Sequence, residues 1–367
     1  MTQTPQGEPK TTNTQQNAGL IIREMEPENL EFPFSTLDSF ITPNERFFIR
    51  SHFPRPKLEV HSWRLKIEGA VERAVEINYE ELISLPSRKV VAMLECAGNS
   101  RVFLVPTASG EQWGLGAVGN AEWTGVSLTT VLESAGLRPD AVEVVLEGAD
   151  AGEIKEEPKT PSVIHFARSL PLAKALSPDV ILAYRMNGAQ LPMSHGFPVR
   201  AIVPGWYSMA SVKWLTRIVV TDRPFNGYFQ SLEYSYWDRH NNLPTLTPVH
   251  EIEVKAEIAR PAMHEVVPAN AQYLMHGAAW AGESEVMKVE VSIDGGQTWD
   301  AARLLNASIR HAWRLWEYDW HTPLNPGRYT VMARAADASG RVQPMQHNPD
   351  SRKYKIDHVL PINVEVK

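Results

Sequence analysis

The sequence predicts an α+β fold, with a mixed α/β domain followed by an all-β, immunoglobulin-like sandwich. At 367 residues the chain is too long for one ordinary core, so we expect two domains. Its first two-thirds mix strand-like and helix-like segments without a regular βαβ rhythm. After about residue 245, short alternating segments separated by turns follow one another, which is typical of a β-sandwich.

The composition narrows the class of protein. The chain is 43% hydrophobic and 22% charged, as in globular proteins, and its net charge is −7. A mildly acidic balance argues against a nucleic-acid partner. Only one cysteine is present, at position 96, which excludes an intrachain disulfide and a multi-cysteine zinc site.

Residues 1–25 are predicted to be a disordered tail, because the segment opens with a long polar stretch. The segment has neither the apolar core of a signal peptide nor a twin-arginine pair. No apolar run reaches the ~18 residues that a membrane span needs. We therefore expect no membrane partner and a cytoplasmic location.

Residues 26–247 form the predicted mixed domain. The segment 61–71 alternates apolar residues on one face and indicates a strand, and Asn78 with Glu81 forms a capping box that starts a helix. A second helix is expected over 127–137, between Ser127 and Gly136, and a third over 169–176. Further strands are expected at 89–95, at 142–150 and around 180–205.

Residues 248–367 form the predicted sandwich, with the boundary near 244–253. Val289, Val291 and Ile293 face one way before an Asp-Gly-Gly turn. The same alternation marks three more segments: 316–320, 329–335 and 362–366.

Cys96 lies in the stretch KVVAMLECAGNSR, at the end of an apolar run. A lone cysteine in this position is commonly a small buried hydrophobic residue. Gly98 and Asn99 suit a sharp turn, however, and Arg101 adds a cation that would favour the thiolate. A thiolate is a nucleophile or a soft metal ligand. The local pattern leaves these interpretations open.

Several cationic or potentially cationic residues lie in otherwise apolar surroundings. Arg50 and His52 project to the same side if their segment is extended. His195 and Arg200 flank a Gly-Phe-Pro turn, and Lys213 follows. If these side chains converge they would suit a phosphate group. Each stretch taken alone is equally compatible with a solvated surface, because sequence spacing does not show convergence.

The stretch Glu-Cys-Ala-Gly-Asn at 95–99 resembles the molybdenum-ligating loop of the sulfite oxidase family. The resemblance extends from about residue 40 to near the C-terminus, and its motifs follow in the family's order. They are RFFIRSH (46–52), WGLGAVGNAEWTGVSL (113–128), LEGAD (146–150), LAYRMNG (182–188), HGFPVR (195–200) and VKWLTRI (212–218). The segment VEVSIDGGQTW (289–299) and the pair at 316–317 resemble the family's dimerisation domain.

The resemblance implies a molybdenum-molybdopterin cofactor, with the Cys96 thiolate as the metal ligand from the protein. It also implies which side chains hold the cofactor: Phe48, His52, Asp150, His195, Arg200, Ser211 and Lys213. The catalytic residues implied in the same way are Arg50, Arg101, Trp113 and Tyr234. The two arginines would hold an oxyanion by forked hydrogen bonds.

The activity implied by the resemblance is oxidation of sulfite to sulfate by oxygen-atom transfer. Electrons would pass to an external acceptor, either a cytochrome or dioxygen, and the chain would form a homodimer through its C-terminal domain. Three features depart from the family pattern. Ser100 stands where an arginine is usual, a further substrate arginine has only Arg352 as a candidate, and no His-Pro-Gly-Gly haem motif is present, so we expect a haem-free form.

Three alternatives to sulfite oxidation remain. The first is a member of the same family that acts on another oxyanion or oxide, such as nitrate or a sulfoxide. The second is a cofactor-binding scaffold without activity. The third is a cysteine hydrolase that uses Cys96 with His195, although no motif in the sequence orients that histidine toward the thiol.

Overall fold

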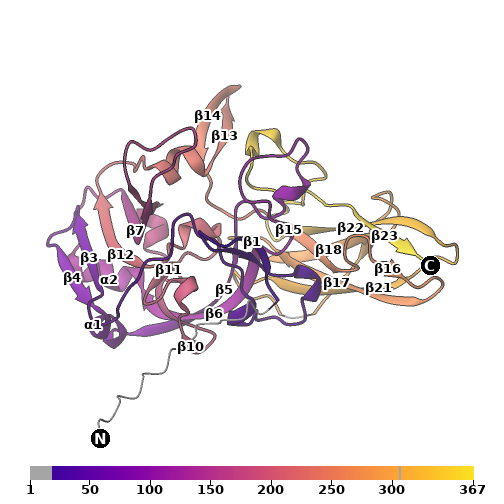
Figure 1. The fold of residues 1–367 in the computed structure, drawn as a ribbon, viewed down its shortest axis with the longest axis horizontal. Coiled ribbons are helices and arrows are strands. Elements are labelled where there is room, and N and C mark those ends of the chain that lie inside the picture. Colours follow the sequence, from indigo (N-terminus) through magenta and orange to yellow (C-terminus); the bar gives the residue numbers. More distant parts are fainter. Residues whose placement is uncertain (1–18, 306) are drawn as a thin grey trace, which may run out of the picture.

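A computed structural model describes residues 19–305 and 307–367 of the chain (Figure 1). The part before about residue 250 contains two five-stranded sheets and all three α-helices. The part after it contains two further sheets and extends away from the first part, with the C-terminus toward its far end. The predicted α+β class is confirmed.

The first sheet has the strand order β10-β9-β6-β5, and β11 pairs with β9. Its strands are antiparallel, and the long β5/β6 pair brings the residue after β5, Cys96, close to the start of β6. The bounds are β5 Ser87–Glu95, β6 Val118–Ser127, β9 Ile181–Met186, β10 Ala189–Gln190 and β11 Arg200–Ile202.

The second sheet has the strand order β4-β3-β12-β7-β8. Only β12 and β3 pair in parallel, and β7 carries Asp150 near its end. The bounds are β3 Arg64–Gly69, β4 Val75–Asn78, β7 Glu143–Gly152, β8 Ile164–Pro171 and β12 Leu215–Thr221.

The helices are short. Helix α1 (Tyr79–Ser84) begins with the predicted capping box, in which Asn78 and Glu81 bond each other's backbone N–H groups, and α2 is Leu128–Ala135. The helix predicted over 169–176 begins later than expected, so the predicted start is wrong. Ser169 lies in β8, where it pairs with Val145, so α3 comprises only Leu172–Ala175. The pairing across the sheet overrides the local helix signal.

The C-terminal part consists of strands, as predicted. One sheet has the order β15-β17-β21-β20 and the other β16-β23-β22-β18-β19. The bounds are β15 Lys255–Arg260, β16 Val266–Val267, β17 Gln272–Trp280, β18 Val286–Ser292, β19 Asp300–Ala301, β20 Arg303–Leu304, β21 Arg314–His321, β22 Gly327–Asp337 and β23 Ile362–Val366.

Apolar residues of the two C-terminal sheets form their own core, separate from the large core of the first part. The chain passes between the two parts through the hairpin of β13 (Ser235–His240) and β14 (Leu243–Pro248), which projects from the molecule in Figure 1. The predicted boundary after residue 247 falls at the end of this hairpin.

The predicted N-terminal tail ends earlier than residue 25. Residues 1–18 lie outside the described part of the chain, but β1 (Ile21–Glu24) pairs with β2 (Asn29–Glu31). Arg23 also forms an ion pair of 2.6 Å with buried Glu31. Across residues 19–305 and 307–367, no helix is long and apolar enough to cross a membrane.

Candidate active site

A cavity with about 610 Å³ of atom-free space opens where the strand ends of the two N-terminal sheets meet. Its walls come from segments that are far apart in the sequence, including the end of β5, the end of β7 and the loops around residues 50, 195 and 211. Ten of the twelve predicted site residues line it: Phe48, Arg50, His52, Cys96, Asp150, His195, Arg200, Ser211, Lys213 and Tyr234. Arg101 and Trp113 do not.

Cys96 is a buried thiol in the cavity wall. Its N–H donates to the Ala117 carbonyl at 2.9 Å, and its own carbonyl accepts from Asn99 N–H at 2.9 Å, so the following turn is tight. Burial raises the pKa of the Cys96 thiol, although the Arg50 and Arg101 cations act in the opposite direction. The free side chain is therefore a poor nucleophile, whereas a metal ion would deprotonate it on binding.

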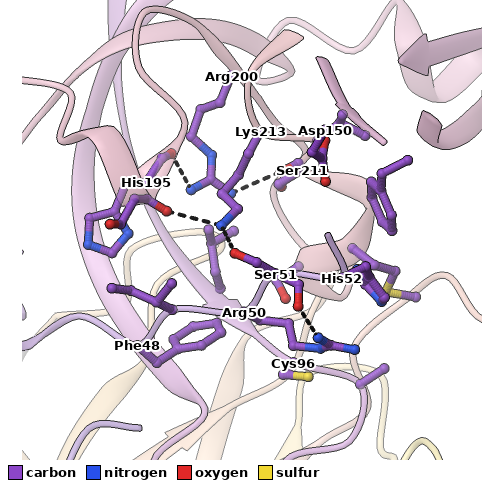
Figure 2. A pocket seen from close by; sticks show the side chains of 18 of the residues that line it. Phe48, Arg50, Ser51, His52, Cys96, Asp150, His195, Arg200, Ser211 and Lys213 are labelled. Atoms are coloured by element: carbon purple, nitrogen blue, oxygen red, sulfur yellow. Dashed lines mark hydrogen bonds between the residues drawn. The ribbon is translucent and has the colours of Figure 1, made fainter. Parts of the chain in front are cut away.

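Lys213 lies between two walls of the cavity, with its ammonium between His195 and Ser51 in Figure 2. The ammonium donates to Ser51 Oγ at 2.8 Å and to the Ser194 carbonyl at 3.0 Å. Burial, aided by the Arg200 cation and opposed by Asp150, lowers the pKa of Lys213 to about 7. An anion bound here would hold the ammonium in its charged form.

Arg200 is a buried side chain of the same wall. Its guanidinium donates to the His195 and Ser211 carbonyls, each at 2.9 Å, as Figure 2 shows. It also lies 5.1 Å from the ring centroid of Trp123, and burial lowers its pKa to about 9. These contacts fix the backbone of two of the loops that line the cavity.

His195 is neutral at physiological pH. Burial and the cations of Arg200 and Lys213 lower its pKa to about 3. Its Nε2–H donates to the Asn44 carbonyl at 3.2 Å, which makes Nδ1 the unprotonated ring nitrogen. Among the described residues no hydrogen bond joins this ring to Cys96, and the two side chains lie apart in Figure 2, so the arrangement does not form the Cys96–His195 pair that a hydrolase needs.

Asp150 carries the one buried carboxylate oxygen of the cavity wall that lacks a partner among the described residues. Its Oδ1 is inaccessible to solvent and accepts no hydrogen bond. Burial raises the pKa of Asp150 to about 6, against the pull of Lys213. Because unpaired buried acceptors are costly, this oxygen is suited to receive an N–H donor from a bound molecule.

Arg50 and the pair His52–Tyr234 form the side of the cavity nearest Cys96. Arg50 donates to the Ser51 carbonyl and, at 3.1 Å, to Asn29 Oδ1. Burial lowers the pKa of Arg50, but nearby acidic groups, led by Tyr234, outweigh it and the pKa rises. The guanidinium therefore stays charged.

His52 Nε2 lies 2.7 Å from the Tyr234 hydroxyl, and its ring stacks on Phe166 with centroids 4.6 Å apart. Burial and the neighbouring cations, Arg50 first, hold the pKa of His52 well below its ordinary value. Burial likewise raises the pKa of Tyr234. Both groups are therefore neutral at physiological pH, and their hydrogen bond orients the phenol at the cavity wall.

The predicted residues Arg101 and Trp113 lie outside the cavity lining. Arg101 donates twice to the Lys353 carbonyl, at 3.0 and 3.1 Å, and once to the Glu111 carbonyl at 2.9 Å. Its guanidinium lies 5.2 Å from the Tyr354 ring centroid. Trp113 is fully buried in the apolar cluster that includes Cys96, and its Nε1–H finds no partner within residues 19–305 and 307–367.

Arg352, the candidate for a further substrate arginine, also lies outside the lining, and its guanidinium donates to Ser235.

Sequence analysis missed several residues that complete the site. Ser51 and Ser194 both accept from the Lys213 ammonium, the former through its hydroxyl and the latter through its carbonyl. Arg168 is fully buried, donates to the Phe229 and Val249 carbonyls, and lies 5.8 Å from the Tyr234 ring centroid. No local signal distinguishes these residues, because their roles arise from contacts with distant segments.

No group of three or more His, Cys, Asp or Glu side chains that could hold a metal ion occurs in the described part of the chain. A metal at Cys96 would therefore take most of its ligands from another molecule. The molybdopterin that the family resemblance implies would supply such ligands, and the cations and the carboxylate of the cavity would hold it.

Two family models cover most of the chain. Residues 52–229 match the oxidoreductase molybdopterin binding domain, and residues 247–351 match the Mo-co oxidoreductase dimerisation domain. The chain is 37% identical to sulfite oxidase from Gallus gallus, over 89% of this chain and 73% of that protein. It is 34% identical to mitochondrial sulfite oxidase from Rattus norvegicus, of which it spans only 63%.

More distant relatives act on other substrates. The chain is 31% identical to the NADH nitrate reductase of Ulva prolifera and spans 40% of that protein. Among solved structures, it resembles the sulfane dehydrogenase SoxCD from Paracoccus pantotrophus, with a TM-score of 0.79 and 26% identity. That match covers 92% of this chain and 84% of the other.

The predicted family and its cofactor, molybdenum-molybdopterin, are thereby confirmed. The chain is a molybdopterin-dependent oxidoreductase and belongs to the sulfite oxidase family.

Proposed function

We propose that this protein oxidises sulfite to sulfate. Sulfite and water yield sulfate, two protons and two electrons, and the electrons leave to an external acceptor. The observation that carries the proposal is that Cys96 and Arg50 face the same buried cavity, so a metal ligand and an oxyanion-binding cation are neighbours. The names of the two sulfite oxidase relatives support it.

Three features of the cavity fit the molybdenum cofactor. Cys96 supplies a soft thiolate ligand, Lys213 and Arg200 supply positive charge for a phosphate, and Asp150 presents an unpartnered oxygen to pterin N–H groups. When bound, the cofactor supplies the transferred oxygen atom and takes up two electrons. Phe48, His52, His195 and Ser211 complete the proposed contact set.

The substrate is held, in this proposal, mainly by Arg50. A doubly charged oxyanion in a buried site needs a permanently charged, forked donor, and Arg50 provides one beside Cys96. Tyr234, oriented by His52, presents a hydroxyl to the reacting oxygen. Arg101 and Trp113 lie outside the cavity lining and contribute by fixing the loop that carries Cys96.

Nitrate reduction is the second candidate. Among the described residues, Arg50 is the only predicted substrate arginine whose side chain lines the cavity, and one guanidinium also suits a singly charged anion. Relatives named nitrate reductase share 31% and 32% identity with this chain. The higher identity of the sulfite oxidases favours sulfite.

The proposal extends to the oligomeric state, the electron acceptor and the location of the protein. The match to a dimerisation domain supports a homodimer through the C-terminal part. The electron acceptor is a cytochrome or dioxygen. The cytoplasmic location stays a prediction, since several relatives are named mitochondrial; cell fractionation would test it.

Steady-state assays on the molybdenum-loaded protein test the substrate. We expect sulfite to reduce a one-electron dye acceptor rapidly, while nitrate and sulfoxides oxidise a reduced viologen slowly or not at all. Faster turnover with nitrate than with sulfite would contradict the proposal and favour the second candidate. Turnover with none of these substrates, despite a full complement of molybdenum, would leave a binding scaffold.

A further inference from the structure

A buried cluster of charged side chains lies where the C-terminal sheets meet the Cys96 turn, outside the cavity lining. Lys255 and Glu257 come from β15 and Glu95 is the last residue of β5. Each is at most 4% exposed. Burying one ammonium and two carboxylates costs several kcal/mol per ion, of the order of the whole stability of a domain. A cluster of this kind needs an explanation beyond stability.

The cluster is connected to the turn through two side chains. The Lys255 ammonium donates to Ser100 Oγ at 2.9 Å, and that hydroxyl donates to Glu257 Oε1 at 2.8 Å. The Asn99 amide donates to Glu95 Oε1 at 3.2 Å. The residues that follow Cys96 by three and four positions are therefore both held by buried charges.

The cluster is also anchored within the C-terminal sheets. Lys255 lies 2.8 Å from Glu257 Oε1 and 3.2 Å from Glu95 Oε1. Trp280, which pairs with Lys255 across β15 and β17, donates its indole N–H to Glu95 Oε2 at 2.9 Å. The carboxylate of Glu95 is thus fixed by the C-terminal part, one residue before Cys96.

The backbone of the turn depends on these contacts. Ser100 has φ 72°, a left-handed conformation that costs about 1 kcal/mol or more in a residue other than glycine. Its N–H donates to the Gly114 carbonyl at 2.7 Å, and Asn99 Oδ1 accepts from Ala117 N–H at 3.0 Å, so the first part of the chain holds the turn through its backbone. The C-terminal part holds the Ser100 side chain.

We propose that Lys255, Glu257 and Glu95 are positioning residues that fix the turn after Cys96, so that the C-terminal sheets set the geometry and retention of the metal ligand. The inference rests on the proposed role of Cys96. In some proteins, buried charged groups select one conformation and add little to stability. Residues that orient metal ligands in this way typically change affinity or activity about 10–100-fold when altered.

The first test is Ser100→Ala, which cuts the link between the cluster and the turn but leaves Lys255 between Glu95 and Glu257. The second is the triple variant E95Q/K255M/E257Q, which removes the charges without leaving one unpaired. We expect both to lose molybdenum about tenfold faster than wild type, with a lower kcat per bound metal and an unchanged KM. Lys255→Arg keeps the cation, so this variant should retain molybdenum much better than the triple variant.

Lys174→Met is the matched control. Lys174 joins α3 to Glu283 of the C-terminal part by an ion pair that does not touch the Cys96 turn. We expect this variant to lower the melting temperature while retaining metal as wild type does. Measurements are the melting temperature, molybdenum per chain during prolonged dialysis, and kcat and KM per bound molybdenum.

Equal metal retention in wild type, Ser100→Ala and the triple variant would overturn the inference and leave the cluster as an adhesive between the two parts. Equal losses in Lys174→Met and Ser100→Ala would also overturn it, because the effect would then follow from general loosening. If the wild-type protein itself contained no molybdenum, the proposed function would be wrong together with this inference. That result differs from the first two, in which wild type holds the metal.

Discussion

Arg50 and Arg101 occupy different environments although both were predicted to bind the substrate. Arg50 lines the cavity and donates through Nη1 to Ser51 and Asn29, whereas Arg101 donates through all three of its nitrogens to the Lys353 and Glu111 carbonyls. These carbonyls are partly buried, and removing Arg101 would take away their donor. We infer that Arg50 acts mainly on the substrate and Arg101 mainly on the loop that carries Cys96.

Arg50→Met tests the first half of this distinction. A hydrogen bond from a charged donor is worth about 1.5–3 kcal/mol, so we expect KM for sulfite to rise about ten- to a hundredfold with a smaller change in kcat. Steady-state kinetics per bound molybdenum measure the effect. Arg64→Met, which alters a partly exposed arginine on β3, is the control and should not change KM. An unchanged KM in Arg50→Met would contradict the assignment.

Arg101→Met tests the second half. Two partly buried carbonyls would lose their donor, at up to about 1–3 kcal/mol each, so we expect a lower denaturation midpoint and faster loss of molybdenum. For metal-loaded enzyme, KM should change less than in Arg50→Met. Denaturant titration together with kinetics decides: a large rise in KM at unchanged stability would mean that Arg101 binds substrate directly.

At the scale of the element, β7 places Asp150 against Lys213 because Gly148 leaves room. A Cβ added at Gly148 would lie 2.5 Å from Asp150 Oδ1 and 2.7 Å from the Lys213 carbonyl. Real Cβ atoms do not approach this closely, so both the Asp150 carboxylate and the Lys213 backbone would have to move.

We therefore expect Gly148→Ala to bind the molybdenum cofactor about tenfold or more weakly while the chain still folds. Gly327→Ala is the matched control, because only a 3.7 Å contact with the Tyr329 side chain awaits its Cβ. Molybdenum per chain and circular dichroism on both variants measure the outcome. Full metal content in Gly148→Ala would show that the position of Asp150 is not critical.

In the segment after β14, His250 is expected to make the stability of the fold depend on pH. His250 stacks on Trp206 with ring centroids 4.4 Å apart, and its buried Nε2 has no partner in the part of the chain that the structure describes. Burial, with the Arg168 and Lys355 cations, lowers the pKa of His250 to about 4. In the unfolded chain the His250 imidazole therefore binds a proton near pH 6.5, whereas in the folded chain it does so only near pH 4.

Because the unfolded state binds more protons in this window, His250 costs stability as the pH falls from about 6.5 to about 4 and contributes no pH dependence above it. We expect the denaturation midpoint of wild type to fall more steeply with acidification than that of His250→Gln. Parallel slopes for the two proteins across this window would contradict the assigned environment. Titrations at about pH 7.5 serve as the reference, where both states are neutral.

The alternation of apolar and polar residues correctly predicted strands that bury one face. It failed where pairing with a segment distant in the sequence determines the structure. The alternation around Val289 and Val291 matches β18 because those two side chains enter the second core. By contrast, Ile21 and Ile22 are exposed, and β1 is held by pairing with β2. Ser169 likewise becomes a strand residue through Val145.

At the scale of the whole molecule, the ordered motifs predicted which side chains meet in the cavity but not how they are supported. Lys255 and Glu257 look like the solvent-facing charges of an ordinary strand in the sequence. Only the packing of the C-terminal sheets against the Cys96 turn buries them. Ser51 escaped notice for a similar reason, because its partner, Lys213, lies 162 positions further along the chain.

The two parts of the chain therefore build one site. The first part supplies the cavity, and the second reaches it through Lys255, Trp280 and the Lys353 carbonyl. The central claim is that this site holds molybdenum through Cys96.

The most direct measurement is molybdenum per chain, by elemental analysis, in wild type and Cys96→Ala purified from a host that makes the cofactor. We predict close to one metal per wild-type chain, and in Cys96→Ala either loss of the metal or loss of sulfite oxidation with metal retained. A folded wild-type protein without molybdenum, or a Cys96→Ala variant with full metal and full activity, would contradict the account.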